Sequence, residues 1–100
     1  MIRHIVFFKF KESAEGRTRA ENMEHVRGML LALPPVIAQI RSMEVGFDVL
    51  RGETSYDMAL VADFGSLEAL SEYTVHPRHK AVSDYVAKVR EARAAVDYEV

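Results

Sequence analysis

The chain has 100 residues, of which 49% are hydrophobic, so it has the size of one domain with one core, and we expect a single domain over residues 1–100. It contains no cysteine, which excludes disulfides, thiolate metal sites and cysteine nucleophiles. The formal net charge is −2, with both signs scattered along the chain, which argues against nucleic acid and anionic membranes as partners.

Residues 2–11 are predicted to form a strand, because apolar side chains alternate there with period two. One face carries His4, Val6, Phe8 and Phe10, and the other carries Ile5, Phe7 and Lys9. An antiparallel strand usually leaves one face in water, so two apolar faces imply that both are covered, one of them by a second subunit. We therefore expect a homodimer, which also suits a domain too small to be very stable alone.

The same segment is not expected to be a signal peptide, since Arg3 and Lys9 interrupt it and no small-residue cleavage site follows. No stretch approaches the roughly 18 uncharged apolar residues that a membrane helix needs. The lack of cysteine fits a reducing compartment. Together these features predict a cytoplasmic protein.

Helical spacing follows up to Leu33, and its apolar stripe consists of Met23, Val26, Met29, Leu30 and Leu33. The sequence from Thr18 to Glu21 has the pattern of a capping box, although the helix could begin earlier, at Ser13. Two prolines at 34 and 35 end the helix. Alternating residues then predict strands over 40–49 and 56–64, separated by a polar turn.

Ser66 can cap a short helix that ends near Val75 or His76, because the residue before a proline avoids the α region. Pro77 suits the first turn of the next helix, whose buried stripe consists of Val82, Tyr85, Val86 and Val89. Residues 94–100 alternate again and are predicted to form a fourth strand.

The order β-α-β-β-α-β, with the second helix split in two, predicts an α+β ferredoxin-like fold with a four-stranded antiparallel sheet and helices on one face. The other face of the sheet needs cover. Two such sheets that pack face to face around a two-fold axis would supply it, so we expect them to pair into a dimeric α/β barrel.

The residues capable of chemistry are mainly the four histidines and Tyr73. His25 lies inside the first helix and is expected at the surface. His4 is on the same strand face as Val6, so under the helices its ring would need a hydrogen-bond partner, either in a functional site or simply in the core. Tyr73 should point inward, and a buried hydroxyl likewise needs a partner.

His76 and His79 flank the corner between the two later helices. With Pro77 at the first helical position, His79 lies in the first turn, where the helix dipole, Arg78 and Lys80 disfavour its imidazolium form. A neutral imidazole is what a general base requires. The alternative is that His76 and Pro77 only cap the helix and set the corner.

Other chemistries find less support in the sequence. The His-x-x-His spacing can place two nitrogens on one metal ion, but the pattern offers no third ligand, so no metal site is predicted. No serine has the context of a nucleophile elbow, and the five glycines are dispersed singly rather than in a phosphate-binding loop. We predict no bound cofactor.

Four segments together resemble the stress-responsive A/B barrel domain family, called Dabb. They are residues 2–11, residues 56–64, the Tyr73-x-x-His76-Pro77-x-His79 segment and residues 96–100, in this order over essentially the whole chain. The resemblance implies a ferredoxin-like protomer that pairs into a barrel through its sheet. Most members of the family have no assigned reaction.

The resemblance also implies an enzymatic relative, the plant polyketide cyclase olivetolic acid cyclase, which works without a cofactor. Its functional residues match His4, Tyr73 and His79. By this likeness, His79 would remove a proton next to a carbonyl, while Tyr73 and His4 would hold or polarise the carbonyl oxygen.

Two classes of function follow as hypotheses. The first is a small-molecule-binding protein with cofactor-independent, cyclase-like acid–base activity on a carbonyl or polyketide-like substrate, with His79, Tyr73 and His4 as its catalytic residues. The alternative is a non-catalytic, stress-related dimeric structural or binding protein whose histidines serve packing and capping. A cofactor-free monooxygenase of similar barrel topology is a further alternative; its haem-degrading relatives use a tryptophan, which this chain lacks.

Overall fold

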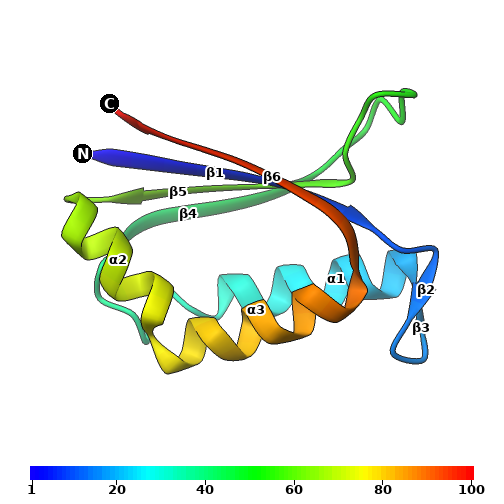
Figure 1. The fold of residues 1–100 in the computed structure, drawn as a ribbon, viewed down its shortest axis with the longest axis horizontal. Helices are drawn as coiled ribbons and strands as arrows, with labels where there is room; N and C mark the ends of the chain where they lie inside the picture. The colour runs from blue at the N-terminus through cyan, green and yellow to red at the C-terminus, as the bar shows by residue number, and fades with distance from the viewer.

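The central strand of the fold is β1 (Ile2–Phe10), in a computed structural model that describes residues 1–100. It pairs antiparallel with β5 (Met58–Phe64) on one side and β6 (Arg90–Glu99) on the other, and β4 (Ile40–Phe47) extends the sheet beyond β5. The strand order is β4-β5-β1-β6 (Figure 1). The predicted ferredoxin-like α+β fold with a four-stranded antiparallel sheet is confirmed.

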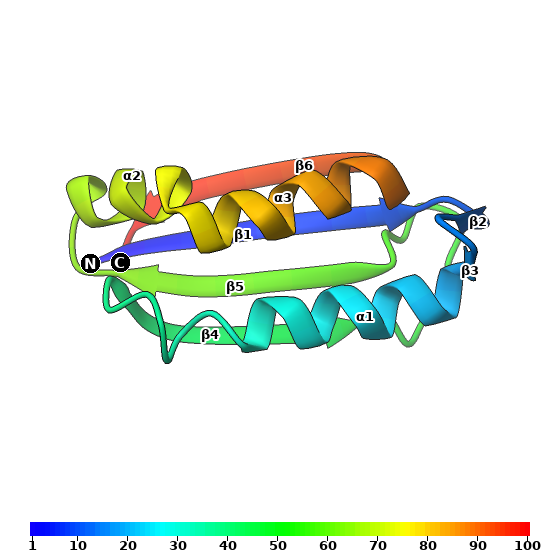
Figure 2. The same ribbon diagram turned by 90° about the horizontal axis from the view of Figure 1, so that it is seen from below.

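Three helices cover one face of this sheet: α1 (Arg19–Leu31), α2 (Leu67–Val75) and α3 (Pro77–Val89) (Figures 1 and 2). The predicted capping box begins α1, since the Thr18 hydroxyl accepts from the Glu21 amide and the Glu21 carboxylate accepts from the Thr18 amide. The helix was predicted to extend to Leu33, but it ends at Leu31. Leu33 directly precedes Pro34, and a residue in that position is pushed out of the α region.

The corner between α2 and α3 forms as the sequence predicts. The Ser66 hydroxyl accepts from the Ala69 amide and begins α2. His76 is extended, with φ −63° and ψ 133°, and its Nδ1 accepts from the Arg78 amide, so it caps α3 with Pro77 in the first turn. The capping role considered for His76 is therefore what the structure shows.

Two predicted boundaries near the first helix and the second strand are wrong. The alternative helix start at Ser13 is replaced by a small hairpin of β2 (Ser13–Ala14) and β3 (Arg17–Thr18), whose turn residues have φ values of 53° and 77°. Strand β4 ends at Phe47, and Val49, expected within the strand, is 93% exposed. Val49 continues the alternation of the sequence but has no partner strand.

The last strand begins earlier than the predicted residue 94. Arg90 both ends α3 and pairs with Phe10, so the chain enters β6 without a loop, and the register shifts between Lys9 and Phe10. The sequence from 90 to 93 lacks clear apolar alternation because two arginines occupy the face toward the helices.

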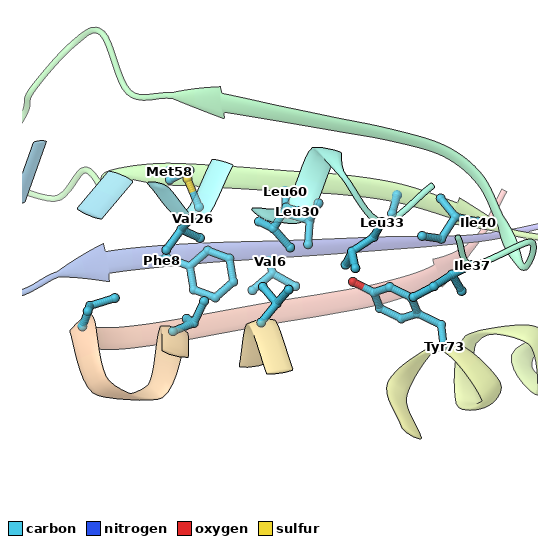
Figure 3. Close-up of a cluster of buried hydrophobic side chains, with 14 of the residues drawn as sticks. Val6, Phe8, Val26, Leu30, Leu33, Ile37, Ile40, Met58, Leu60 and Tyr73 are labelled. Carbon is cyan, nitrogen blue, oxygen red and sulfur yellow. The ribbon is translucent and has the colours of Figure 1, made fainter. Parts of the chain in front are cut away.

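The core lies between the sheet and the helices, and its side chains come from β1, β4, β5, the three helices and the segment between α1 and β4 (Figure 3). The opposite face of the sheet is open in the single chain. Phe7, Val96 and Tyr98 lie on it and are 43%, 60% and 44% exposed. None of the helices is long and apolar enough to cross a membrane.

Candidate active site

His4, Tyr73 and His79 line one cavity of about 310 Å³ between the sheet and the helices. They come from β1, α2 and α3, respectively. The ring centroids of His4 and Tyr73 are 6.4 Å apart, and those of Tyr73 and His79 are 4.2 Å apart. The structure therefore brings together the three residues that the sequence singled out.

The walls of this cavity are largely apolar. They consist of Val6, Phe8, Leu30, Leu60, Val82 and Val86, with Ala87 beside them. The remaining lining residues are Thr74, Ser83, Arg90 and Arg93. A volume of about 310 Å³ is at the lower end of the range for small-molecule sites, and an apolar wall with a few converging polar groups is their usual composition.

A second cavity, of about 380 Å³, lies at Phe7, Phe47 and Tyr56, where the chain leaves β4. It contains no histidine, and its carboxylate, Asp48, is paired with Arg51. We consider the smaller cavity the better candidate, because it holds the groups that can exchange a proton near neutral pH.

Tyr73 has the buried hydroxyl that the sequence analysis anticipated. The side chain is 1% exposed, its ring packs 4.9 Å from that of Phe64, and Figure 3 shows its oxygen pointing into the interior. The hydroxyl has no hydrogen-bond partner within the protein. Burial raises the pKa of Tyr73 to about 12, which keeps the O–H protonated. Tyr73 thus carries a hydrogen-bond donor that no group of the chain accepts from.

His79 is held in one orientation by the end of α2. Its Nδ1 lies 3.0 Å from the carbonyl oxygen of Thr74, so Nδ1 carries the proton and donates it. In the neutral ring, Nε2 then has a free lone pair. Burial lowers the pKa of His79 and outweighs the opposing bond to Thr74, and the nearby charges of His4, Arg93 and His76 lower it further.

The neutral state expected for His79 agrees with this direction, but the expected cause is wrong. Arg78 and Lys80 are exposed and do not contribute to the lowered pKa of His79, whereas burial makes the largest contribution. The burial of His79 is therefore the main reason for its lowered pKa, and charged neighbours contribute less.

His4 is oriented by a partner that the sequence pattern does not reveal. Its Nδ1 forms a hydrogen bond with the Asp97 carboxylate, and the two residues are direct partners in the register of β1 and β6. Because the carboxylate fixes the proton at Nδ1, Nε2 is the nitrogen left to contact a bound molecule. Pairing the first strand with the last in antiparallel register would have been the signal that identified Asp97.

The other histidines stay outside this arrangement. His25 is exposed on α1, where it packs 4.9 Å from the ring of Tyr85, as expected for a surface residue. His76 caps α3 and does not line the cavity. No group of three or more histidine, aspartate or glutamate side chains is close enough together to hold a metal ion.

The sequence of the chain matches one protein family over almost its whole length. A sequence model described as the stress responsive A/B barrel domain, Dabb, matches residues 2–100. No curated protein matches the chain. Among solved structures, a dimeric protein of unknown function with a ferredoxin-like fold from Bacteroides fragilis is 34% identical, with a TM-score of 0.84 over 99% of this chain and 95% of its own.

A dimeric ferredoxin-like protein of unknown function from Thermobifida fusca is 29% identical, with a TM-score of 0.84 over 99% of this chain and 90% of its own. A hydroxynitrile lyase from Passiflora edulis has a TM-score of 0.83 over 99% and 92%, at 14% identity, a likeness of fold alone. With the family model matched from the second residue to the last, the chain belongs to the stress-responsive A/B barrel domain family.

Proposed function

We propose that the protein binds a small carbonyl compound and acts on it as a cofactor-independent acid–base catalyst. The observation that carries this proposal is that the rings of Tyr73 and His79 line the same cavity, with their centroids 4.2 Å apart. One ring has a protonated hydroxyl without a partner, and the other has a neutral nitrogen without a proton. A donor and an acceptor side by side can polarise a carbonyl and remove a proton from the carbon next to it.

In the reaction we propose, the Tyr73 hydroxyl donates to the substrate carbonyl oxygen, and Nε2 of His79 takes a proton from the adjacent carbon. The C–H electron pair forms the C=C bond of an enolate, whose oxygen charge Tyr73 stabilises. The enolate carbon can then attack a second carbonyl of the same molecule. The new alkoxide takes the proton back from His79, which balances the cycle, while His4 accepts from a substrate hydroxyl.

The similarity of fold to a hydroxynitrile lyase supports the proposal in one limited respect: this architecture is compatible with an enzyme. A non-catalytic binding or structural protein remains the rival function. It would explain the capping by His76 and the bond from His79 to Thr74, but it leaves the unpaired Tyr73 hydroxyl without a purpose.

The proposal also includes a homodimer formed through the open sheet face. Phe7, Val96 and Tyr98 lie exposed on this face, and contiguous apolar surface of this kind is uncommon on monomers. The Bacteroides and Thermobifida structures are both described as dimeric. Pairing of the two sheets would leave the candidate cavity of each subunit, which lies on the helix side, away from the interface.

Deuterium exchange tests the acid–base role directly. The protein is incubated in D₂O with a panel of aryl ketones, and incorporation of deuterium next to the carbonyl is followed by NMR. We expect the wild type to exceed the buffer rate, and His79→Gln to lower the enzymatic rate about 100-fold or more, in the range for loss of a general base. His25→Gln, the matched exposed histidine, should leave the rate unchanged.

Thermal shift with the same ketones and with polyketide-like carbonyl compounds measures binding separately, because a ligand of the native state raises the melting temperature. Ligand binding that is insensitive to His79→Gln and Tyr73→Phe, together with no exchange above buffer for any ketone, would reject catalysis and favour the non-catalytic alternative.

A further inference from the structure

The charged side chains that line the cavity are both basic, and the nearby Asp97 carboxylate is hydrogen-bonded to His4. The 14 lining residues of the cavity include two arginines, Arg90 and Arg93, and no aspartate or glutamate. This contrasts with the whole chain, which has 15 acidic and 13 basic side chains. A positive edge on an otherwise apolar cavity favours a ligand that carries a negative group.

Both arginines come from the first part of β6. Arg90 pairs with Phe10 and Arg93 with Phe8, and both phenylalanines are buried on the helix side of the sheet. The two arginines therefore share that side, at the edge of the sheet where the cavity meets solvent. Arg93 is exposed and Arg90 is half-buried, so each can meet an entering ligand.

Neither arginine has an acidic partner within the chain. Arg3, Arg27 and Arg51 each bond a carboxylate, whereas neither Arg90 nor Arg93 takes part in any side-chain hydrogen bond or ion pair. Burial raises the pKa of Tyr73 and lowers that of His79, and in both cases the positive charge of Arg93 makes a smaller, lowering contribution, so its field reaches the same two rings that line the cavity.

We propose that Arg90 and Arg93 bind the carboxylate of the molecule that the cavity holds, so that the substrate class is a small aromatic or alkyl carboxylic acid that also bears a carbonyl. This inference rests on the proposed function, because it names the substrate of the same site. The guanidinium fork matches a carboxylate in two parallel hydrogen bonds. A cavity of about 310 Å³ leaves room for a small head group beside an apolar body.

The proposal also fixes the direction in which the ligand lies. His4 and Phe8 are four residues apart on β1, which is about 13 Å at the usual rise along a strand. The Asp97-oriented His4 is at one end of this span, and Arg93, opposite Phe8, is at the other. The carboxylate thus anchors one end of the ligand, while the apolar walls of the cavity hold the body toward Tyr73.

The test compares aromatic acids with their neutral primary amides by isothermal titration calorimetry on the full chain. The panel consists of acylbenzoic, acylnaphthoic and aroylalkanoic acids, which carry both the carboxylate and the carbonyl of the proposed class, each paired with its amide of nearly equal shape. We expect the wild type to bind the acids about tenfold or more tighter than the amides, the ratio that one charge-assisted contact supports. Arg90→Gln/Arg93→Gln should abolish this ratio and leave amide binding unchanged.

Arg78→Gln is the matched control, since Arg78 is exposed on α3 and does not line the cavity. It should keep the acid preference. Melting temperatures and circular dichroism of every variant check that the fold is intact. An aryl phosphate of matched shape that binds tighter than the acid, and loses this advantage in the double variant, would overturn the assignment to a carboxylate.

The outcomes separate this inference from the proposed function. Equal binding of acids and amides, or an acid preference that survives in the double variant, refutes the arginine site while leaving exchange that depends on His79 untouched. Failure of every acid and every amide to bind refutes a carboxylate ligand. Loss of His79-dependent ketone exchange alongside an arginine-dependent acid preference would refute catalysis and keep the binding site.

Discussion

At the scale of single residues, Tyr73 combines two properties that rarely occur together in a core. Its ring fills space against Phe64, whereas its buried hydroxyl has no partner. An unpaired buried hydroxyl costs free energy of about 1–3 kcal/mol, so selection for stability alone would favour phenylalanine. Stability therefore favours phenylalanine at position 73, whereas the proposed reaction requires the hydroxyl of tyrosine.

Tyr73→Phe therefore separates the two demands. Removing a hydroxyl that bonds nothing in the chain should leave the free energy of unfolding unchanged or raise it by about 1 kcal/mol. It should also remove the donor that holds the carbonyl oxygen, and so lower deuterium exchange. Urea unfolding and the exchange assay measure both effects. A loss of stability of more than about 1 kcal/mol would indicate that the hydroxyl has a structural partner.

The lowered pKa of His79 predicts how the stability and the activity of the protein depend on pH. This pKa is lower in the folded protein than its ordinary value of 6.5, so below that value the unfolded chain binds more protons than the folded chain. Stability should thus fall as the pH drops below 6.5 and level off above it. Exchange activity should rise through the same acidic window, as His79 loses its proton, and reach a plateau at neutral pH.

Melting temperatures and exchange rates measured across this window check the prediction, with His79→Gln as the comparison. The variant should show a shallower fall in stability at acidic pH. An activity that instead declines as the pH rises toward neutrality would mean that the protonated imidazole is the active form.

At the scale of elements, the beginning of α1 depends on a local sequence signal. Thr18→Ala removes the hydroxyl that accepts from the Glu21 amide at 3.2 Å and should lower the free energy of unfolding by about 1 kcal/mol, the usual loss for such a cap. Thr54→Ala, in the exposed loop before β5, should change it by less than about 0.5 kcal/mol. Urea denaturation of both variants distinguishes the cap from a general effect of removing a threonine.

The site itself is assembled by elements that are distant in the chain. The sequence placed His4 on a strand, Tyr73 on the inner side of a short helix and His79 in the first turn of the next. These positions follow from periodicity and from proline, which act locally. Asp97, Arg90 and Arg93 were missed because their relevance depends on β6 lying beside β1, a pairing between opposite ends of the chain.

At the scale of the whole molecule, the open face of the sheet decides the expected assembly. Val96→Glu places a charge among Ile5 and the exposed apolar side chains of this face, where a second subunit would bury it at high cost. We expect the variant to be monomeric, or to dissociate at concentrations at least about tenfold higher than the wild type. Analytical ultracentrifugation over a dilution series measures this.

Leu67→Glu is the matched control for this variant. Leu67 is 65% exposed at the first turn of α2, on the helix side of the molecule, where an acidic residue is tolerated. It should sediment like the wild type. If Leu67→Glu dissociates and Val96→Glu does not, the subunits associate through the helices instead of the sheet.

By itself, the sequence determined the order of the elements, the caps of the helices, the inner and outer faces of β1 and the three residues of the candidate site. Each of these depends on spacing or on residue type within a few positions, so the information is local. The tertiary structure alone decided that β6 begins at Arg90, that Asp97 orients His4, and that burial lowers the pKa of His79. These features depend on which strands are neighbours and on what covers them, and contacts between distant parts of the chain determine both.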